Sequence, residues 1–202
     1  MLRVEKKLPE VNGRVTVRRA TARDLEAVLE IASSVGSERK DSDQGFLVDD
    51  YLNDRGAVRK KMRNALNGLQ HFYMAEIAGE PVGFLMAYRK EEWLADNPEW
   101  IEAVQWHPSF QKNLLRNFAV VDKTAIRADL TGRGIGSDLY VQLIEDLKDT
   151  GIRTLLAETI IDPVPNFASL NFRKKQRYQL AGMRYEFYNS RIYTDLVYFK
   201  KI

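Results

Sequence analysis

The chain has no cysteine and only two histidines, His71 and His107, among its 202 residues. The lack of cysteine excludes disulfides, thiolate metal sites and a cysteine nucleophile. With so few histidines, we expect a protein that needs no metal. The chain also lacks an apolar run of the about 18 residues that a membrane helix requires, and residues 1–7 contain no apolar signal core. We therefore expect a cytoplasmic protein that does not bind membranes.

The chain also has nearly equal numbers of positive and negative residues. Lysine and arginine number 31 against 28 acidic residues, for a net charge of +3, which is too small to indicate nucleic-acid binding by itself. The local basic run at residues 173–177 is more typical of a solvated helix face than of a nucleic-acid patch. The length, the 45% hydrophobic content and the lack of repeats indicate one domain over residues 1–202.

Three glycines, Gly132, Gly134 and Gly136, lie between an apolar run at residues 118–126 and an amphipathic run at residues 135–149. This order predicts a strand, a glycine turn and the start of a helix. A helix N-terminus exposes unpaired N–H groups and the positive end of the helix dipole, and glycines let an anion approach that backbone closely. The segment therefore predicts a phosphate site, with an ordinary turn as the alternative.

Two common nucleotide-binding loops do not fit this segment. A dinucleotide fingerprint requires glycine three residues after Gly136, where this chain has Leu139. A Walker A loop ends in Gly-Lys-Ser/Thr, whereas Gly136 is followed by Ser137 and Asp138.

Periodicity and turn residues predict an α/β domain. A capping box at residues 21–24 opens the first helix, residues 36–46 read as a loop, and Gly79 and Pro81 supply a hairpin turn. We predict further helices at 56–69, 135–149 and 166–175. The predicted strands are 14–18, 72–77, 82–88, 118–127, 154–161, 183–189 and 191–200.

Two elements of the chain resemble the GCN5-related N-acetyltransferases (GNAT family). The family's acyl-CoA loop, Arg/Gln-x-x-Gly-x-Gly/Ala, corresponds to residues 131–136, with Thr131 at the leading position. A downstream family element, Asn-x-x-Ala-x-x-Leu/Phe-Tyr-x-Lys-x-Gly-Phe, is matched at Asn166, Ser169, Phe172, Lys175 and Tyr178, whereas Arg173 and Arg177 replace the tyrosine and the glycine. The resemblance covers residues 14–200 and is tightest over 118–178.

The resemblance implies a mixed, mostly antiparallel twisted sheet flanked by helices, with acetyl-CoA as cosubstrate. Pantetheine would pair with the fourth strand at Thr124, Ala125 and Ile126, and the Ile126 N–H would polarise the thioester oxygen. Asn166 would bind pantetheine or line the gap between the fourth and fifth strands, and the basic run can help to hold the CoA 3′-phosphate. The pyrophosphate would lie on the loop formed by Gly132, Arg133, Gly134, Ile135, Gly136 and Ser137.

The sequence leaves several candidates for the general base and the general acid. Glu158 and Asp122 are carboxylates in otherwise apolar strands, so each is either salt-bridged or a general base, with Glu76 as a weaker third candidate. Arginine cannot release a proton at neutral pH, so Tyr178 is predicted to act as the acid in place of Arg173, with Tyr140, Tyr193 or water as alternatives.

Residues 90–116 are an insertion between the third and fourth strands, and they contain all three tryptophans and His107. Two interpretations stay open. The segment is either a structural flap or oligomer contact, which would suit a homodimer, or a lid over the acyl-acceptor pocket.

The predicted activity is acetyl-CoA-dependent N-acetyl transfer to a primary amine by direct attack on the thioester. The acceptor would be a small-molecule or peptide amine. An acyl-CoA-binding sensor or regulatory domain with little turnover is the alternative, favoured by Thr131 and Arg173. A nucleic-acid-associated protein using the basic run is a third reading, which we do not favour.

Overall fold

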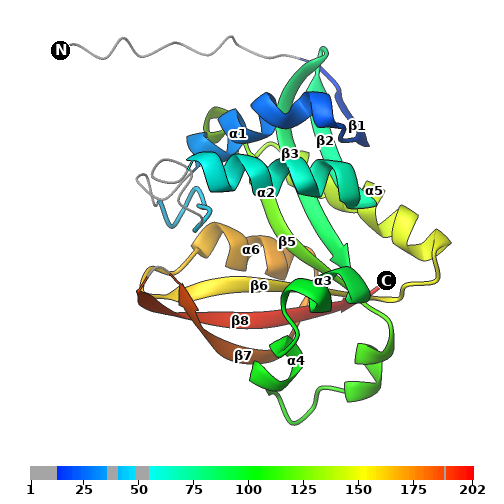
Figure 1. Cartoon of the computed structure of the whole chain (residues 1–202), viewed down its shortest axis with the longest axis vertical. Helices are drawn as coiled ribbons and strands as arrows, with labels where there is room; N and C mark the ends of the chain where they lie inside the picture. The colour runs from blue at the N-terminus through cyan, green and yellow to red at the C-terminus, as the bar shows by residue number, and fades with distance from the viewer. Residues whose placement is uncertain (1–12, 36–40, 49–54, 189) are drawn as a thin grey trace.

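The computed structural model describes residues 13–35, 41–48, 55–188 and 190–202. Within them, eight strands form one sheet in the order β1-β2-β3-β5-β6-β8-β7-β4. Every neighbouring pair is antiparallel except β5 and β6, which run parallel. Helices lie on both sides of the sheet (Figure 1). The predicted fold class, a mixed and mostly antiparallel sheet flanked by helices, is confirmed.

The predicted strands are all present, with differences at their ends and one additional short strand, Gln105–Trp106, within the insertion. Pro81 lies within β3, and the hairpin turn is formed by Ala78 and Gly79, whose φ angles are 53° and 82°. The strand predicted to begin at residue 183 begins earlier, at Gln179. The strands are β1 (Val15–Arg19), β2 (His71–Ile77), β3 (Glu80–Arg89), β4 (Gln105–Trp106), β5 (Ala119–Ile126), β6 (Thr154–Asp162), β7 (Gln179–Tyr188) and β8 (Arg191–Lys201).

The predicted helices are also present. The Thr21 N–H donates to Asp24 Oδ2 at 2.7 Å, so the predicted capping box forms, and a 3-10 turn over Ala22–Asp24 leads into the first helix. Of the predicted loop at 36–46, residues 36–40 lie outside the described residues. The helices are α1 (Leu25–Ser34), α2 (Arg55–Gly68), α3 (Lys90–Asp96), α4 (Trp100–Ala103), α5 (Ile135–Asp149) and α6 (Phe167–Lys175).

The sheet separates two hydrophobic cores. Successive strand residues point to opposite faces, so Phe84 and Met86 of β3 pack with α1 and α2, whereas Leu85 and Ala87 pack with α5. In Figure 1, α1 and α2 lie together over the upper part of the sheet. Phe172 of α6 joins the core under α5.

The insertion at residues 90–116 folds as α3, α4, β4 and a 3-10 turn (Lys112–Arg116), and it joins the first core. Trp93 and Trp100 are buried and Trp106 is half-buried. The Trp100 ring stands edge-on to Trp93 and to Trp106, with centroid distances of 6.0 and 5.8 Å. The tryptophans are thus core residues and do not form an exposed contact surface. Among the described residues, no helix combines the length and apolarity needed to span a membrane.

Strands β5 and β6 separate soon after they begin to pair. Their register covers only Ala119–Val121 against Leu155–Ala157. Further along, β5 pairs with β3 as far as Ile126, and β6 pairs with β8 as far as Asp162. The facing backbone edges of the two strands therefore have no strand partner beyond Val121 and Ala157 within the described residues. This divergence creates the gap that holds the candidate site.

Candidate active site

A cleft of about 1130 Å³ opens where β5 and β6 diverge. Its walls come from both strands, from the glycine loop with the start of α5, from α6, from β7 and β8, and from residues 43–48. The predicted loop residues Gly132, Gly134, Ile135, Gly136 and Ser137 all line it. Arg133 does not, and its side chain is exposed.

The glycine loop presents open backbone to the cleft. Gly134 is the N-cap of α5 and has φ +90°, a conformation that side chains rarely adopt. A Cβ at this position would meet no atom within 4 Å. The amides of Ile135 and Gly136 open the helix and lack an intrahelical acceptor, whereas the Ser137 N–H already donates to the Gly134 carbonyl at 2.8 Å. The loop can therefore accept an anion at residues 134–136.

The two sides of the gap carry buried hydroxyls. Thr124 Oγ1 on β5 and Thr159 Oγ1 on β6 are buried, and neither has a hydrogen-bond partner within the described part of the chain. Both residues line the cleft, as do the predicted residues Ala125 and Ile126. The Arg127 N–H donates to the Val82 carbonyl of β3 at 2.9 Å. Because successive strand residues alternate in direction, we infer that the Ile126 N–H points into the gap.

Asn166 lies at the cleft as the N-cap of α6. Its Oδ1 accepts from the Ser169 N–H at 3.0 Å, and its Nδ2 donates to the Phe46 carbonyl at 3.0 Å. The side chain thus ties the segment around Phe46 to α6 and shapes the wall. The predicted contact of Asn166 with a ligand stays a prediction.

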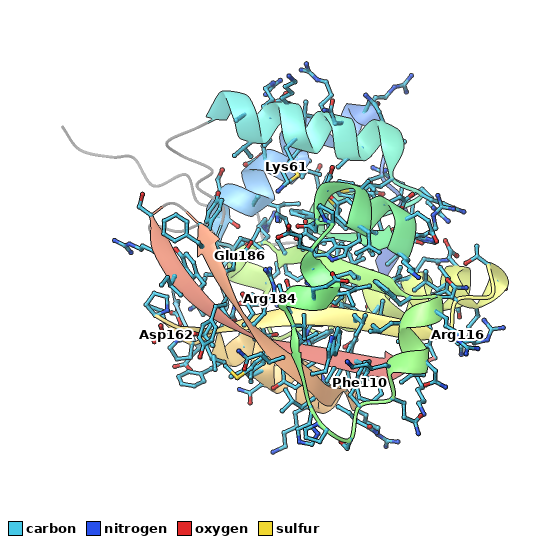
Figure 2. All side chains as sticks on the ribbon, turned by 60° about the horizontal axis from the view of Figure 1, so that its bottom comes forward. Lys61, Phe110, Arg116, Asp162, Arg184 and Glu186 are labelled. Atoms are coloured by element: carbon cyan, nitrogen blue, oxygen red, sulfur yellow. The ribbon has the colours of Figure 1, made fainter. Side chains whose placement is uncertain are left out.

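Glu158 is held by two residues from other elements. Trp100 Nε1 of the insertion donates to Oε1 at 2.8 Å. Arg184 of β7 donates from Nε to Oε1 and from Nη2 to Oε2, the latter at 3.0 Å. The same guanidinium pairs with Glu186 at 3.0 Å. Figure 2 labels Arg184 and Glu186, which lie two residues apart on β7.

Asp122, the second predicted base, lies at a β-bulge. Met86 of β3 faces Lys123 and the next residue, Ala87, faces Val121, so Asp122 is left without an opposite residue. Lys123 Nζ pairs with Asp122 Oδ2 at 3.1 Å although the two are neighbours in the chain. Glu76 pairs with Arg18 at 2.6 Å and does not line the cleft.

Asp195 is a cleft residue that the sequence reasoning missed. It lies on β8 opposite Ile160 and Arg184, and only 3% of it is exposed. Burial raises the pKa of Asp195 to about 7, an effect strengthened by Glu158 and Glu186 and opposed by Arg184. The sequence does indicate that Asp195 faces inward. In the alternating segment 191–200, it shares its face with the apolar residues Tyr193, Val197 and Phe199.

The predicted acid, Tyr178, is buried and does not line the cleft. Burial raises its pKa well above the usual range. Tyr140 of α5 does line the cleft, and Arg173 donates to its hydroxyl at 2.5 Å. The arginine that replaces the usual tyrosine therefore holds another phenol at the site. In the described part of the chain, no group of three acidic or histidine side chains is placed to hold a metal ion.

Comparison with known proteins gives the class. The family model described as "Acetyltransferase (GNAT) family" matches residues 37–176, more than half of the chain. The chain therefore belongs to the GNAT family of acetyltransferases, which use acetyl-CoA. No curated protein matches the sequence significantly.

Solved structures share the fold at low sequence identity. The PaiA N-acetyltransferase of Thermoplasma acidophilum, in complex with coenzyme A, is 16% identical with a TM-score of 0.63, covering 94% of this chain and 99% of its own. The polyamine N-acetyltransferase of Drosophila melanogaster is 12% identical, with a TM-score of 0.62 and coverage of 94% and 100%. The ribosomal-protein-S18-alanine N-acetyltransferase of Escherichia coli is 15% identical, with a TM-score of 0.58 and coverage of 94% and 94%.

Proposed function

We propose that this acetyltransferase moves the acetyl group of acetyl-CoA to a primary amine, by direct attack of the amine nitrogen on the thioester. The observation that carries the proposal is the divergence of β5 and β6 after three residue pairs, at a cleft lined by both the glycine loop and several carboxylates. A chain molecule can lie in such a gap as an additional strand, while its charged end reaches the helix N-terminus.

The chemistry of the gap suits the two halves of CoA. The open backbone at Gly134–Gly136 would bind the pyrophosphate, and Arg133, exposed beside it, adds positive charge. The buried hydroxyls of Thr124 and Thr159 offer hydrogen bonds to the pantetheine amides. The Ile126 N–H would donate to the thioester oxygen, where negative charge develops during attack.

The carboxylates of the cleft suit an amine acceptor. Glu158, Glu186, Asp122 and Asp195 line the cleft together with Arg184 and Lys123. A carboxylate beside an ammonium group can accept its N–H in a charge-assisted hydrogen bond. The acceptor would be a small-molecule or peptide amine, and the protein would act as a cytoplasmic, single-domain enzyme.

The experiment is a thiol-release assay with acetyl-CoA and a panel of amines that includes diamines, amino acids, aminoglycosides and peptides with free N-termini. We expect thiol release that depends on one class of amine, with the acetylated amine identified by mass spectrometry. Tight acetyl-CoA binding without thiol release on any amine would instead favour the sensor, the reading suggested by Thr131 and Arg173 in place of the family's usual residues.

A further inference from the structure

Three carboxylates of the cleft lie on one face of the sheet. Glu158 is opposite Val197 and Ile160 is opposite Asp195 across β6 and β8, while Arg184 is opposite Asp195 across β7 and β8. Directly opposite residues point to the same face, and residues two apart along a strand do so as well. Glu158, Asp195 and Glu186 therefore share one face with Arg184 between them.

These three carboxylates differ in what already binds them. Glu158 accepts three N–H donors from Trp100 and Arg184, and Glu186 accepts one from Arg184. Asp195 Oδ2 is buried and has no hydrogen-bond partner within the described residues. A buried carboxylate oxygen without a donor is costly, and Asp195 is one of the residues that line the cleft. Of the oxygens of these three carboxylates, this is the one that the structure shows to be buried with its acceptor positions unused within the described residues.

The charges around Asp195 also suit proton transfer. Glu158 from β6 and Glu186 from β7 disfavour its ionised form, Arg184 from β7 favours it, and burial raises its pKa to about 7. The Asp122–Lys123 pair of β5 acts on the neighbouring Glu186, whose pKa Asp122 raises and Lys123 lowers. A general base is most effective when its pKa is near the working pH. A fraction of it is then deprotonated, and it is still basic enough to take a proton.

We propose that Asp195 is the general base of the acetyl transfer and that Glu158, fixed by Trp100 and Arg184, positions the amine beside it. This assignment rests on the proposed function. The Asp195 carboxylate takes one proton from the acceptor ammonium. The nitrogen lone pair then forms a bond to the thioester carbonyl carbon, and the carbon–sulfur bond breaks with its electron pair going to sulfur. The second proton leaves the nitrogen and ends on the CoA thiolate.

The test compares Asp195→Asn, Glu158→Gln and Asp122→Asn with wild type, on the best amine of the panel and across pH. The exposed Asp149→Asn at the far end of α5 is the control. For Asp195→Asn we expect kcat/KM to fall by about 10²–10⁴-fold and the limb near pH 7 to disappear, with CoA affinity by calorimetry unchanged. For Glu158→Gln we expect a raised KM for the amine, with that limb retained.

A second variant separates a catalytic role of the Asp195 side chain from a merely structural one. Asp195→Ala leaves space for a small carboxylate, so added formate should restore part of the rate, which a merely structural loss would not allow. The assignment is overturned if Asp195→Asn keeps the rate and the limb, if Asp195→Ala is not rescued, or if Glu158→Gln or Asp122→Asn alone removes the limb. If wild type releases no thiol with any amine, the proposed function fails, and the assignment fails with it.

Discussion

Trp100 Nε1 donates a hydrogen bond of 2.8 Å to Glu158 Oε1, and this bond joins the insertion at residues 90–116 to the cleft. The two residues are 58 positions apart in the chain. The indole belongs to the first hydrophobic core, while the carboxylate lies at the point where β6 leaves β5. The insertion therefore holds Glu158 of the cleft from within the core.

Trp100→Phe tests this link. The phenyl ring keeps aromatic packing but removes one of the three donors to Glu158, so we expect a several-fold higher KM for the amine and unchanged CoA affinity. A hydrogen bond to a charged group contributes about 1.5–3 kcal/mol, so chemical denaturation should show a loss of that order.

Trp106→Phe is the matched control for this prediction. Its indole donates to the Ile101 carbonyl at 2.9 Å, in the same aromatic cluster but away from the cleft. It should lose stability and keep its amine KM. Equal amine kinetics in the two variants would show that the bond between Trp100 and Glu158 does not shape the acceptor side.

Gly134→Ala tests the phosphate loop. Gly134 has φ +90° and Gly151, which follows the far end of α5, has φ +78°, and a Cβ at either position meets no atom within 4 Å. Each substitution should therefore impose a similar backbone cost of about 1–2 kcal/mol. Only Gly134→Ala should also weaken CoA binding, by tenfold or about 1.4 kcal/mol, as measured by calorimetry. An equal loss in Gly151→Ala would mean that strain alone, and not the approach of phosphate, explains the effect.

The local parts of this architecture could be predicted from the sequence. The glycine loop depends only on residues that are neighbours in the chain. The helix α5 is predicted with its bounds at 135 and 149, because the helical period of its apolar residues is visible within that one segment. Pro81 is predicted in the turn because proline is a common turn residue, but it lies in β3. It fits in β3 because β2 is irregular opposite it, with a register shift between Ala75 and Glu76.

The cluster of Glu158, Arg184 and Asp195 could not be predicted in the same way, because it depends on pairing between distant strands. Asp195 and Glu158 come together only when β8 pairs with β6, and Arg184 joins them only when β7 pairs with β8. The short helices α3 and α4 have seven and four residues, too few to show a helical period. Alternation in β8 shows that Asp195 faces inward, but not which residues it meets there.

Thr124→Val and Thr159→Val test how the gap holds pantetheine. Valine has nearly the shape of threonine and removes a buried hydroxyl that has no partner in the described residues. The free protein should be as stable as wild type or more so. Acetyl-CoA affinity should fall by about 3–10-fold, the value of one hydrogen bond of about 0.5–1.5 kcal/mol.

Adenosine 3′,5′-bisphosphate, which lacks pantetheine, provides the control ligand. Its affinity should be the same for wild type and for both threonine variants, because neither hydroxyl would contact it. If calorimetry shows that both variants bind acetyl-CoA as tightly as wild type does, pantetheine does not use these hydroxyls.

Asp195→Asn should change how stability depends on pH. The pKa of Asp195 is raised to about 7 in the folded protein, against about 3.9 in an unfolded chain. A raised pKa means that the folded state binds the proton more tightly. The stabilising effect is therefore full below about pH 4 and is lost as pH rises through 7. Asparagine does not titrate, so the variant avoids this loss, while every other titrating group is common to both proteins.

The expected result is a difference that grows with pH. Measured by urea unfolding, the variant should gain about 2–3 kcal/mol relative to wild type between about pH 5 and about pH 8.5. Any constant effect of the new amide cancels in this comparison, and Asp149→Asn should follow wild type at both values. A constant offset between Asp195→Asn and wild type would mean that the carboxylate ionises at its ordinary pKa in the folded protein. In that case burial among Glu158, Glu186 and Arg184 would not hold Asp195 ready to accept a proton near neutral pH.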